Sequence, residues 1–193
     1  MSLKKIIKVA AFAIALTASA AHAELVTNGN FETGNLSGFS VDPNGIGYVG
    51  VDSEAPRTGA FSAFFAGTDP ASPDTISQTL ATEIGATYHI SFWLQSEADA
   101  NPDSMFSASF GNTLLVSLMN DPGFAYRNFT YDLVASSASS VLSFTGYNAP
   151  TAYDLDDVSV TRVGSAEVPE PGTAALLGLG FVGMMRLRRK QSA

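Results

Sequence analysis

The chain has 193 residues, no cysteine, and 18 acidic residues against ten Lys/Arg. The lack of cysteine excludes disulfides, thiol catalysis and cysteine-ligated metals. Seven of the ten cations lie in the two chain ends, residues 1–23 and 168–193, so residues 24–167 hold three arginines against 17 acidic residues, a formal net charge of −14. Such an acidic surface repels phosphate backbones, and we therefore expect no nucleic-acid partner.

The first 23 residues have the pattern of a secretory signal peptide. Three lysines lie within the first eight residues, an apolar run follows at residues 9–16, and Ala21-His22-Ala23 forms an A-x-A cleavage site. We expect cleavage after Ala23, so that Glu24 begins the mature protein. Residues 24–167 are long enough for one domain with its own core.

Between residues 24 and 167 the chain is predicted to be all-β. Short runs rich in aromatic and β-branched residues alternate with Gly, Pro, Asn, Asp and Ser turns, and no run has a helical apolar stripe. The expected strands are residues 25–26, 47–51, 62–66, 75–80, 87–95, 105–110, 114–118, 126–134, 140–146 and 153–162. A hairpin turn is expected at Gly111-Asn112, because both residue types tolerate positive φ angles. This many short strands in one domain predict a single β-sandwich of the jelly-roll type.

Residues 168–193 predict a membrane sorting tail with three parts. The polar box Pro169-Glu170-Pro171 comes first, then 13 uncharged residues from 173 to 185, and then a cluster of Arg and Lys. The apolar run spans roughly 20 Å as a helix, which is short for the bilayer core. The cations beyond it are expected to hold the C-terminus in the cytoplasm.

This tail resembles the PEP-CTERM sorting signal of Gram-negative, exopolysaccharide-producing bacteria. The order of a Pro169-Glu170-Pro171 box, a Gly/Leu-rich segment and an Arg cluster carries the resemblance. The resemblance implies transient residence in the inner membrane, recognition and cleavage by an exosortase, and delivery to the cell surface or the extracellular matrix. The other interpretation is an ordinary C-terminal anchor.

Three short patches resemble the galactose-binding-like jelly rolls that include several carbohydrate-binding modules. The patches are N-G-x-F-E at residues 28–32, Y-x-I-S-F-x-L at residues 88–94 and L-D-D-V-S-V at residues 155–160. In those domains one calcium ion commonly joins the first strand to the last. The resemblance assigns the carboxylate ligands to Glu32 and Asp157, with backbone carbonyls from residues 52–59. The alternative makes Glu32 a turn acid and Asp157 a solvated charge at a sheet edge.

A candidate sugar-binding face follows from strand alternation in residues 87–95. Tyr88, Ile90, Phe92 and Leu94 would share the core face, and His89, Ser91, Trp93 and Gln95 the opposite face. The single tryptophan, Trp93, is expected to stack on a pyranose ring, with hydrogen bonds from His89 and Gln95. Further candidates are Tyr147, Asn148, Tyr126 and Arg127. The alternative is that a neighbouring loop or strand covers Trp93, which then serves packing.

Catalysis is not expected. His89 is the only histidine outside the signal peptide and has no nucleophile motif nearby. Carboxylate pairs such as Asp156-Asp157 arise readily in a domain with 17 acidic residues. The sequence and these resemblances thus predict an exported, exosortase-sorted surface or matrix protein, with exopolysaccharide as the expected ligand. Two alternatives are a purely structural acidic matrix protein and a secreted glycan-active enzyme, which would need two carboxylates facing each other across a cleft.

Overall fold

The computed structural model describes residues 23–42, 48–97 and 103–164. These residues belong to one unit of the chain, His22–Ser165. The predicted signal peptide and the sorting tail, including Pro169, Glu170 and Pro171, lie outside the described residues. No helix within the described part of the chain is long and apolar enough to cross a membrane.

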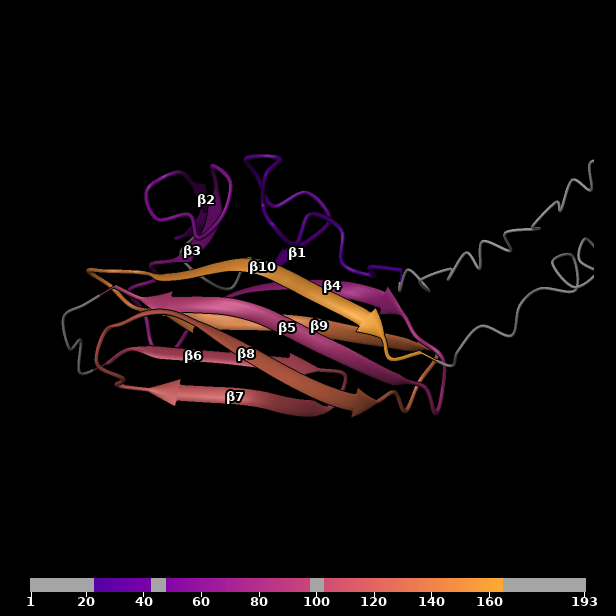
Figure 1. Ribbon diagram of the computed structural model, residues 1–193. Helices are drawn as coiled ribbons and strands as arrows, with labels where there is room; N and C mark the ends of the chain where they lie inside the picture. Colours follow the sequence, from indigo (N-terminus) through magenta and orange to yellow (C-terminus); the bar gives the residue numbers. More distant parts are fainter. Residues whose placement is uncertain (1–22, 43–47, 98–102, 165–193) are drawn as a thin grey trace, which may run out of the picture. The chain divides into compact units, whose positions relative to one another are not determined.

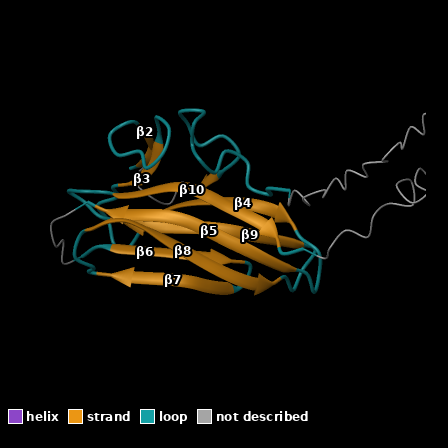
Figure 2. Cartoon of the chain, viewed as in Figure 1, coloured by secondary structure: helices purple, strands orange, loops and turns teal. Residues whose placement is uncertain are grey.

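The described residues form a β-sandwich without helices, in which every strand pair is antiparallel (Figures 1 and 2). The strands are β1 (Ser40–Asp42), β2 (Val49–Asp52), β3 (Ser62–Phe65), β4 (Asp74–Ala81), β5 (Thr87–Ser96), β6 (Met105–Phe110), β7 (Thr113–Met119), β8 (Phe124–Val134), β9 (Ser139–Tyr147) and β10 (Tyr153–Arg162). One sheet, called sheet A, has the order β2-β3-β10-β5-β8, and the other, sheet B, has the order β1-β4-β9-β6-β7. The chain thus has the predicted jelly-roll architecture.

At the N-terminal side of the domain, one predicted strand is wrong and one observed strand was not predicted. Residues 25–26 form no strand, because the segment meets β10 only through an isolated bridge between Glu24 and Thr161. There the Glu24 carboxylate accepts hydrogen bonds from the backbone N–H groups of Val26 and Val160, in place of a continued ladder. In addition, the sequence did not predict β1, a three-residue exposed edge strand that pairs with β4.

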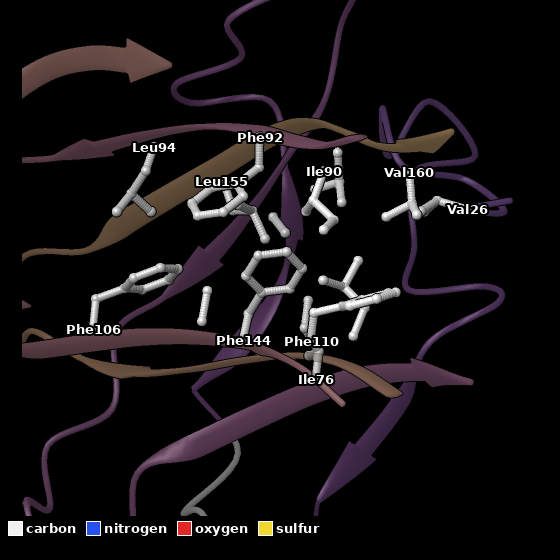
Figure 3. Packing of buried hydrophobic residues seen from close by; sticks show 14 of the residues in the cluster. Val26, Ile76, Ile90, Phe92, Leu94, Phe106, Phe110, Phe144, Leu155 and Val160 are labelled. Atoms are coloured by element: carbon white, nitrogen blue, oxygen red, sulfur yellow. The ribbon is translucent and has the colours of Figure 1, made fainter. Parts of the chain in front are cut away.

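The core lies between the sheets and consists of the alternate residues of their strands (Figure 3). Along β5 the predicted alternation is confirmed, since Tyr88, Ile90, Phe92 and Leu94 are all buried. Phe92 packs against Phe144 of sheet B at a ring-centroid distance of 5.2 Å. Burying a side chain of this size contributes about 1.5–3 kcal/mol. Strand alternation therefore fixes which face of β5 is directed outward.

The predicted hairpin joins β6 and β7 through Gly111 and Asn112. Gly111 has φ = 58°, a left-handed conformation that glycine adopts without steric cost. The turn is attached to β9, because the Gly111 N–H donates a hydrogen bond to the Val141 carbonyl of that strand. A tight connection of this kind keeps β7 in register as the last strand of sheet B.

Candidate functional site

Residues 55–61, which we call the clasp segment, connect the opening part of the domain to its last strand. The contact with the opening part of the domain is made by Glu32, whose Oε1 atom accepts hydrogen bonds from the N–H groups of Ala60 (2.9 Å) and Phe61 (3.0 Å). Gly59 lies so close that an added Cβ would stand 2.2 Å from this oxygen, and its φ is +66°. The site therefore requires glycine at position 59.

The other side of the clasp segment is held by the two consecutive acids of β10. The buried Asp156 accepts hydrogen bonds from the N–H groups of Arg57 and Thr58, both at 3.0 Å. Asp157 forms an ion pair with the Arg57 guanidinium and accepts a hydrogen bond from the Thr58 hydroxyl. Asp157 has φ = 49°, and the pairing of β10 with β5 is irregular between Asp156 and Ser159. This irregularity directs two successive carboxylates to the same segment.

Glu32 and Asp157 thus contact the same short segment, one from the opening part of the domain and the other from β10. Carboxylate and carbonyl oxygens are the ligands that Ca²⁺ prefers, so the chemistry of the donors fits calcium. The donors are nevertheless already engaged, Glu32 by backbone N–H groups and Asp157 by Arg57. Within residues 23–42, 48–97 and 103–164, no three His or acidic side chains are grouped as metal ligands. A bound ion would have to share these carboxylates with donors of the clasp segment.

Burial of the Asp156 carboxyl raises its pKa. The Thr58 and Asp157 N–H groups act in the opposite direction, because they stabilise the charged form, whereas the neighbouring Asp157 charge raises the pKa further. Arg57 is the counter-charge that the structure supplies at this place. A neutral residue at position 57 would leave two adjacent carboxyls without a cation.

Trp93 lies on the outward face of β5, as predicted, but its ring is not free on both sides. The Arg57 guanidinium stacks on the indole, with its Cζ atom 3.5 Å from the ring centroid. Trp93 is half-buried and stands opposite Asp156 of β10 and Asn128 of β8. A sugar ring could therefore stack only on the uncovered side of the indole, or after Arg57 has moved.

The two residues expected to hydrogen-bond a sugar beside Trp93 are both engaged in hydrogen bonds. The exposed His89 bonds through Nδ1 to Asp132 Oδ1 at 2.7 Å. The Gln95 side-chain amide donates to Asp154 Oδ2 at 3.0 Å. The structure thus places His89, Trp93 and Gln95 on one face, as the alternation predicts, and shows that each contacts a charged residue.

Of the remaining sugar-binding candidates, Tyr126 and Arg127 lie on β8, the strand beside Trp93, whereas Tyr147 and Asn148 lie at the end of β9 in the other sheet. Tyr147 ends β9 in the opposite sheet and is buried. Asn148 is buried too, and its amide donates to the Ala152 carbonyl at 3.0 Å. Arg127 stacks on Phe124. Tyr126 lies near the clasp segment, where its hydroxyl donates to the Ala55 carbonyl at 2.7 Å.

A pocket lined by four acidic residues was missed by the sequence reasoning. Its walls include Asp52 at the end of β2, Glu54, Glu97 after β5, and Asp154 of β10, and its volume is about 200 Å³. Burial raises the pKa of Asp154 to about 7, with smaller contributions from the charges of Glu97, Asp52 and Glu54, while the hydrogen bond from Gln95 lowers it. These acids come from distant parts of the sequence, so no local motif indicates that they meet.

The sorting tail matches a known family model. Residues 167–190 match the PEP-CTERM protein-sorting motif, which confirms the resemblance and indicates an exported protein with a membrane-anchored sorting intermediate. The match covers the tail alone. Among curated proteins, no sequence match was found.

The sandwich is similar to several solved structures. TmCBM61 in complex with β-1,4-galactotriose has a TM-score of 0.57 at 15% identity, over 72% of this chain and 99% of that one. The CBM22-1 xylan-binding domain of Xyn10C from Paenibacillus barcinonensis has a TM-score of 0.54 at 19% identity, over 77% and 100%. The enzymatically active domain of tailspike protein 4 from bacteriophage CBA120 has a TM-score of 0.55 at 15% identity, over 72% and 21%. At these identities the likeness establishes the jelly-roll fold alone.

Proposed function

We propose that the protein is processed by an exosortase and then serves, at the cell surface or in the extracellular matrix of a Gram-negative bacterium, as a non-catalytic binder of exopolysaccharide. One observation carries this proposal: a PEP-CTERM sorting motif follows a sandwich with the fold of carbohydrate-binding modules. Of the similar structures, one is a complex with a galactose oligomer and another is a xylan-binding domain. Delivery to a polysaccharide-rich exterior would bring such a sandwich to its ligand.

A glycan array tests the proposal. The probe is the full chain in detergent micelles, applied once with millimolar calcium and once with chelator. We expect binding to at least one bacterial exopolysaccharide or plant-type galactan or xylan. No binding in either condition would overturn the proposal and leave the alternative, an acidic matrix protein without a specific ligand.

We also propose that calcium strengthens the clasp. Glu32 and Asp157 would be the carboxylate ligands, because they approach residues 57–61 from the opening segment and from β10. The ion would supply positive charge where Arg57 now faces two adjacent carboxyls alone. Its role would be structural, holding the first and last parts of the sandwich together.

One observation favours a second candidate, a glycan-active enzyme. Glycoside hydrolysis uses a pair of carboxyls, one of which is protonated near neutral pH. The pocket lined by Asp52, Glu54, Glu97 and Asp154 contains several carboxyls, and Asp154, with its pKa raised to about 7, has the property of a general acid.

The hydrolase candidate is tested with a reducing-sugar assay on galactan, xylan and the matrix polysaccharide. Release of sugar ends by the wild-type chain, lost in Asp154→Asn, would support the enzyme. Binding without any release of sugar ends would support the non-catalytic binder.

A further inference from the structure

The outward face of sheet B carries two rows of hydroxyl side chains that run across the strands. The partners are set by the strand register, since directly opposed residues of antiparallel strands point to the same side. The first row is Thr75, Thr145, Ser107 and Ser117. The second row is Ser77, Ser143 and Ser109. We call these seven residues the hydroxyl face.

The side chains of the hydroxyl face are accessible. Ser117 is exposed, and the other six are partly exposed, whereas their neighbours in sequence on the same strands, such as Ile76, Phe144 and Ala108, are buried in the core. Within the first row, the Thr75 and Thr145 hydroxyls hydrogen-bond to each other at 2.8 Å. The rows are therefore ordered from strand to strand.

The four strands that carry the hydroxyl face have little charge in a very acidic domain. Strands β4, β6, β7 and β9 contain a single charged residue, Asp74, which is buried. Residues 24–167 as a whole contain 17 acidic residues, and the strands β10 and β8 of sheet A carry several of the charged ones. On the outward side of sheet B the register places one acidic residue, Asp42 of the edge strand β1, beside Thr75 at the end of the first row. The four strands that carry the hydroxyl face are otherwise without exposed charge.

The geometry points to a neutral polysaccharide as the occupant. Neighbouring strands lie about 4.8 Å apart, and residues i and i+2 lie about 6.7 Å apart along a strand. The hydroxyls therefore form a grid with these two spacings. Each hydroxyl both donates and accepts, as do the hydroxyls of a sugar chain. We propose that the hydroxyl face binds an uncharged glycan chain laid across β4, β9 and β6.

Charge and composition decide between this ligand and others. An anionic polymer would be repelled by the net charge of −14 on residues 24–167. A protein partner centred on the rows is disfavoured, because serine is depleted in protein interfaces. The exposed Met119, opposite Met105, lies beyond the first row on the edge strand β7. The inference rests on the proposed function, and it adds the face and the chemical class of the glycan.

The test is affinity electrophoresis of the full chain in detergent, through gels containing neutral arabinoxylan, galactan or an acidic glucuronoxylan. Replacing Ser109 and Ser143 together by alanine should weaken binding of a neutral glycan about tenfold, because each hydroxyl loses a hydrogen bond. Ser136→Ala with Ser137→Ala is the control, since these two exposed serines lie in the bend between β8 and β9, outside both rows. Circular dichroism follows folding of each variant.

Each outcome has one meaning. Binding of a neutral glycan that falls in the Ser109/Ser143 variant and persists in the control supports the inference. Binding that persists in the Ser109/Ser143 variant, or a preference for the acidic glucuronoxylan, overturns the inference but leaves the proposed function intact. Absence of binding to every glycan overturns the proposed function itself. If ultracentrifugation shows wild-type dimers that Ser143→Gln dissociates, the face binds a second copy and the inference is wrong.

Discussion

At the scale of single residues, the contact between Arg57 and Trp93 determines how much of the indole is available on the outward face of sheet A. The indole stands where alternation places it, yet the Arg57 guanidinium covers one of its sides at 3.5 Å. A cation over an aromatic ring contributes about 0.5–2 kcal/mol, depending on how far the pair is desolvated. The structure thus gives Trp93 a packing role beside any role in sugar binding.

Replacing Trp93 by alanine is expected to lower the free energy of unfolding by about 2–4 kcal/mol, because a large half-buried ring and its stacked cation are lost. Thermal denaturation measures this change. Arg57→Ala separates the two roles, because it uncovers the indole without removing it. If Trp93 is a sugar platform, Arg57→Ala should keep or raise glycan affinity while Trp93→Ala lowers it 10- to 100-fold. Unchanged affinity in both variants would leave Trp93 as a packing residue only.

Asp154 is expected to make stability depend on pH. Its pKa is raised from 3.8 to about 7, mainly by burial, so the folded protein holds this proton more tightly than the unfolded chain. The contribution is favourable at low pH and is lost as the pH rises from about 4 to about 7, by up to about 4 kcal/mol. Asp154→Asn should therefore be more stable than wild type at pH 8 and similar to it at pH 4. Equal stability differences at both pH values, measured by denaturant unfolding, would contradict this.

At the scale of elements, strand positions were predictable from local patterns, whereas the meeting of Glu32 and Asp157 with residues 52–59 was expected only from the family resemblance. Alternation of large apolar residues with small polar ones, as in Tyr88 to Gln95, marks a strand with one buried face. The exposed β1 has no such alternation, and its three residues show no buried face. The clasp segment contacts Glu32, Asp156 and Asp157, which are about 30 to 100 positions away in sequence. No local pattern contains that information.

The clasp carries the calcium prediction. Calcium should raise the melting temperature of the full chain, because a ligand that binds only the folded state stabilises it, by about 2.7 kcal/mol at 100 times its Kd. Glu32→Gln and Asp157→Asn should each remove most of this gain. Glu83→Gln is the control, since Glu83 pairs with Arg162 away from the clasp segment. Identical calorimetric transitions of the wild type in millimolar calcium and in chelator would rule the ion out.

At the scale of the whole molecule, the acidic charge is unevenly distributed between the sheets. β10 alone has three aspartates, whereas β6, β7 and β9 have no charged residue. The count of acids was available from the sequence, and their segregation was not, because it depends on the strand order of the two sheets. The acidic pocket around Asp154 also follows from that order, since it joins residues from β2, β10 and the end of β5.

The sorting prediction belongs to this scale as well. Replacing Pro169, Glu170 and Pro171 by alanine should leave an unprocessed form in the inner membrane, because the box lies in the matched motif, residues 167–190, while the apolar run is unchanged. Cell fractionation and mass spectrometry distinguish the two forms. Alanine at Gly164 and Ser165, just before the motif, is the control. Surface delivery of the box variant at the normal level would refute the role of the box.

Trp93 is the only tryptophan of the chain, and the Arg57 side chain of the clasp segment stacks on its indole. The intrinsic fluorescence of the unlabelled protein is therefore a report from this single place. Release of Arg57 would hydrate the indole and shift its emission to longer wavelength before the sandwich itself unfolds. Opening of the clasp, by chelator, by a glycan or by acid, can thus be followed in real time without introducing a dye.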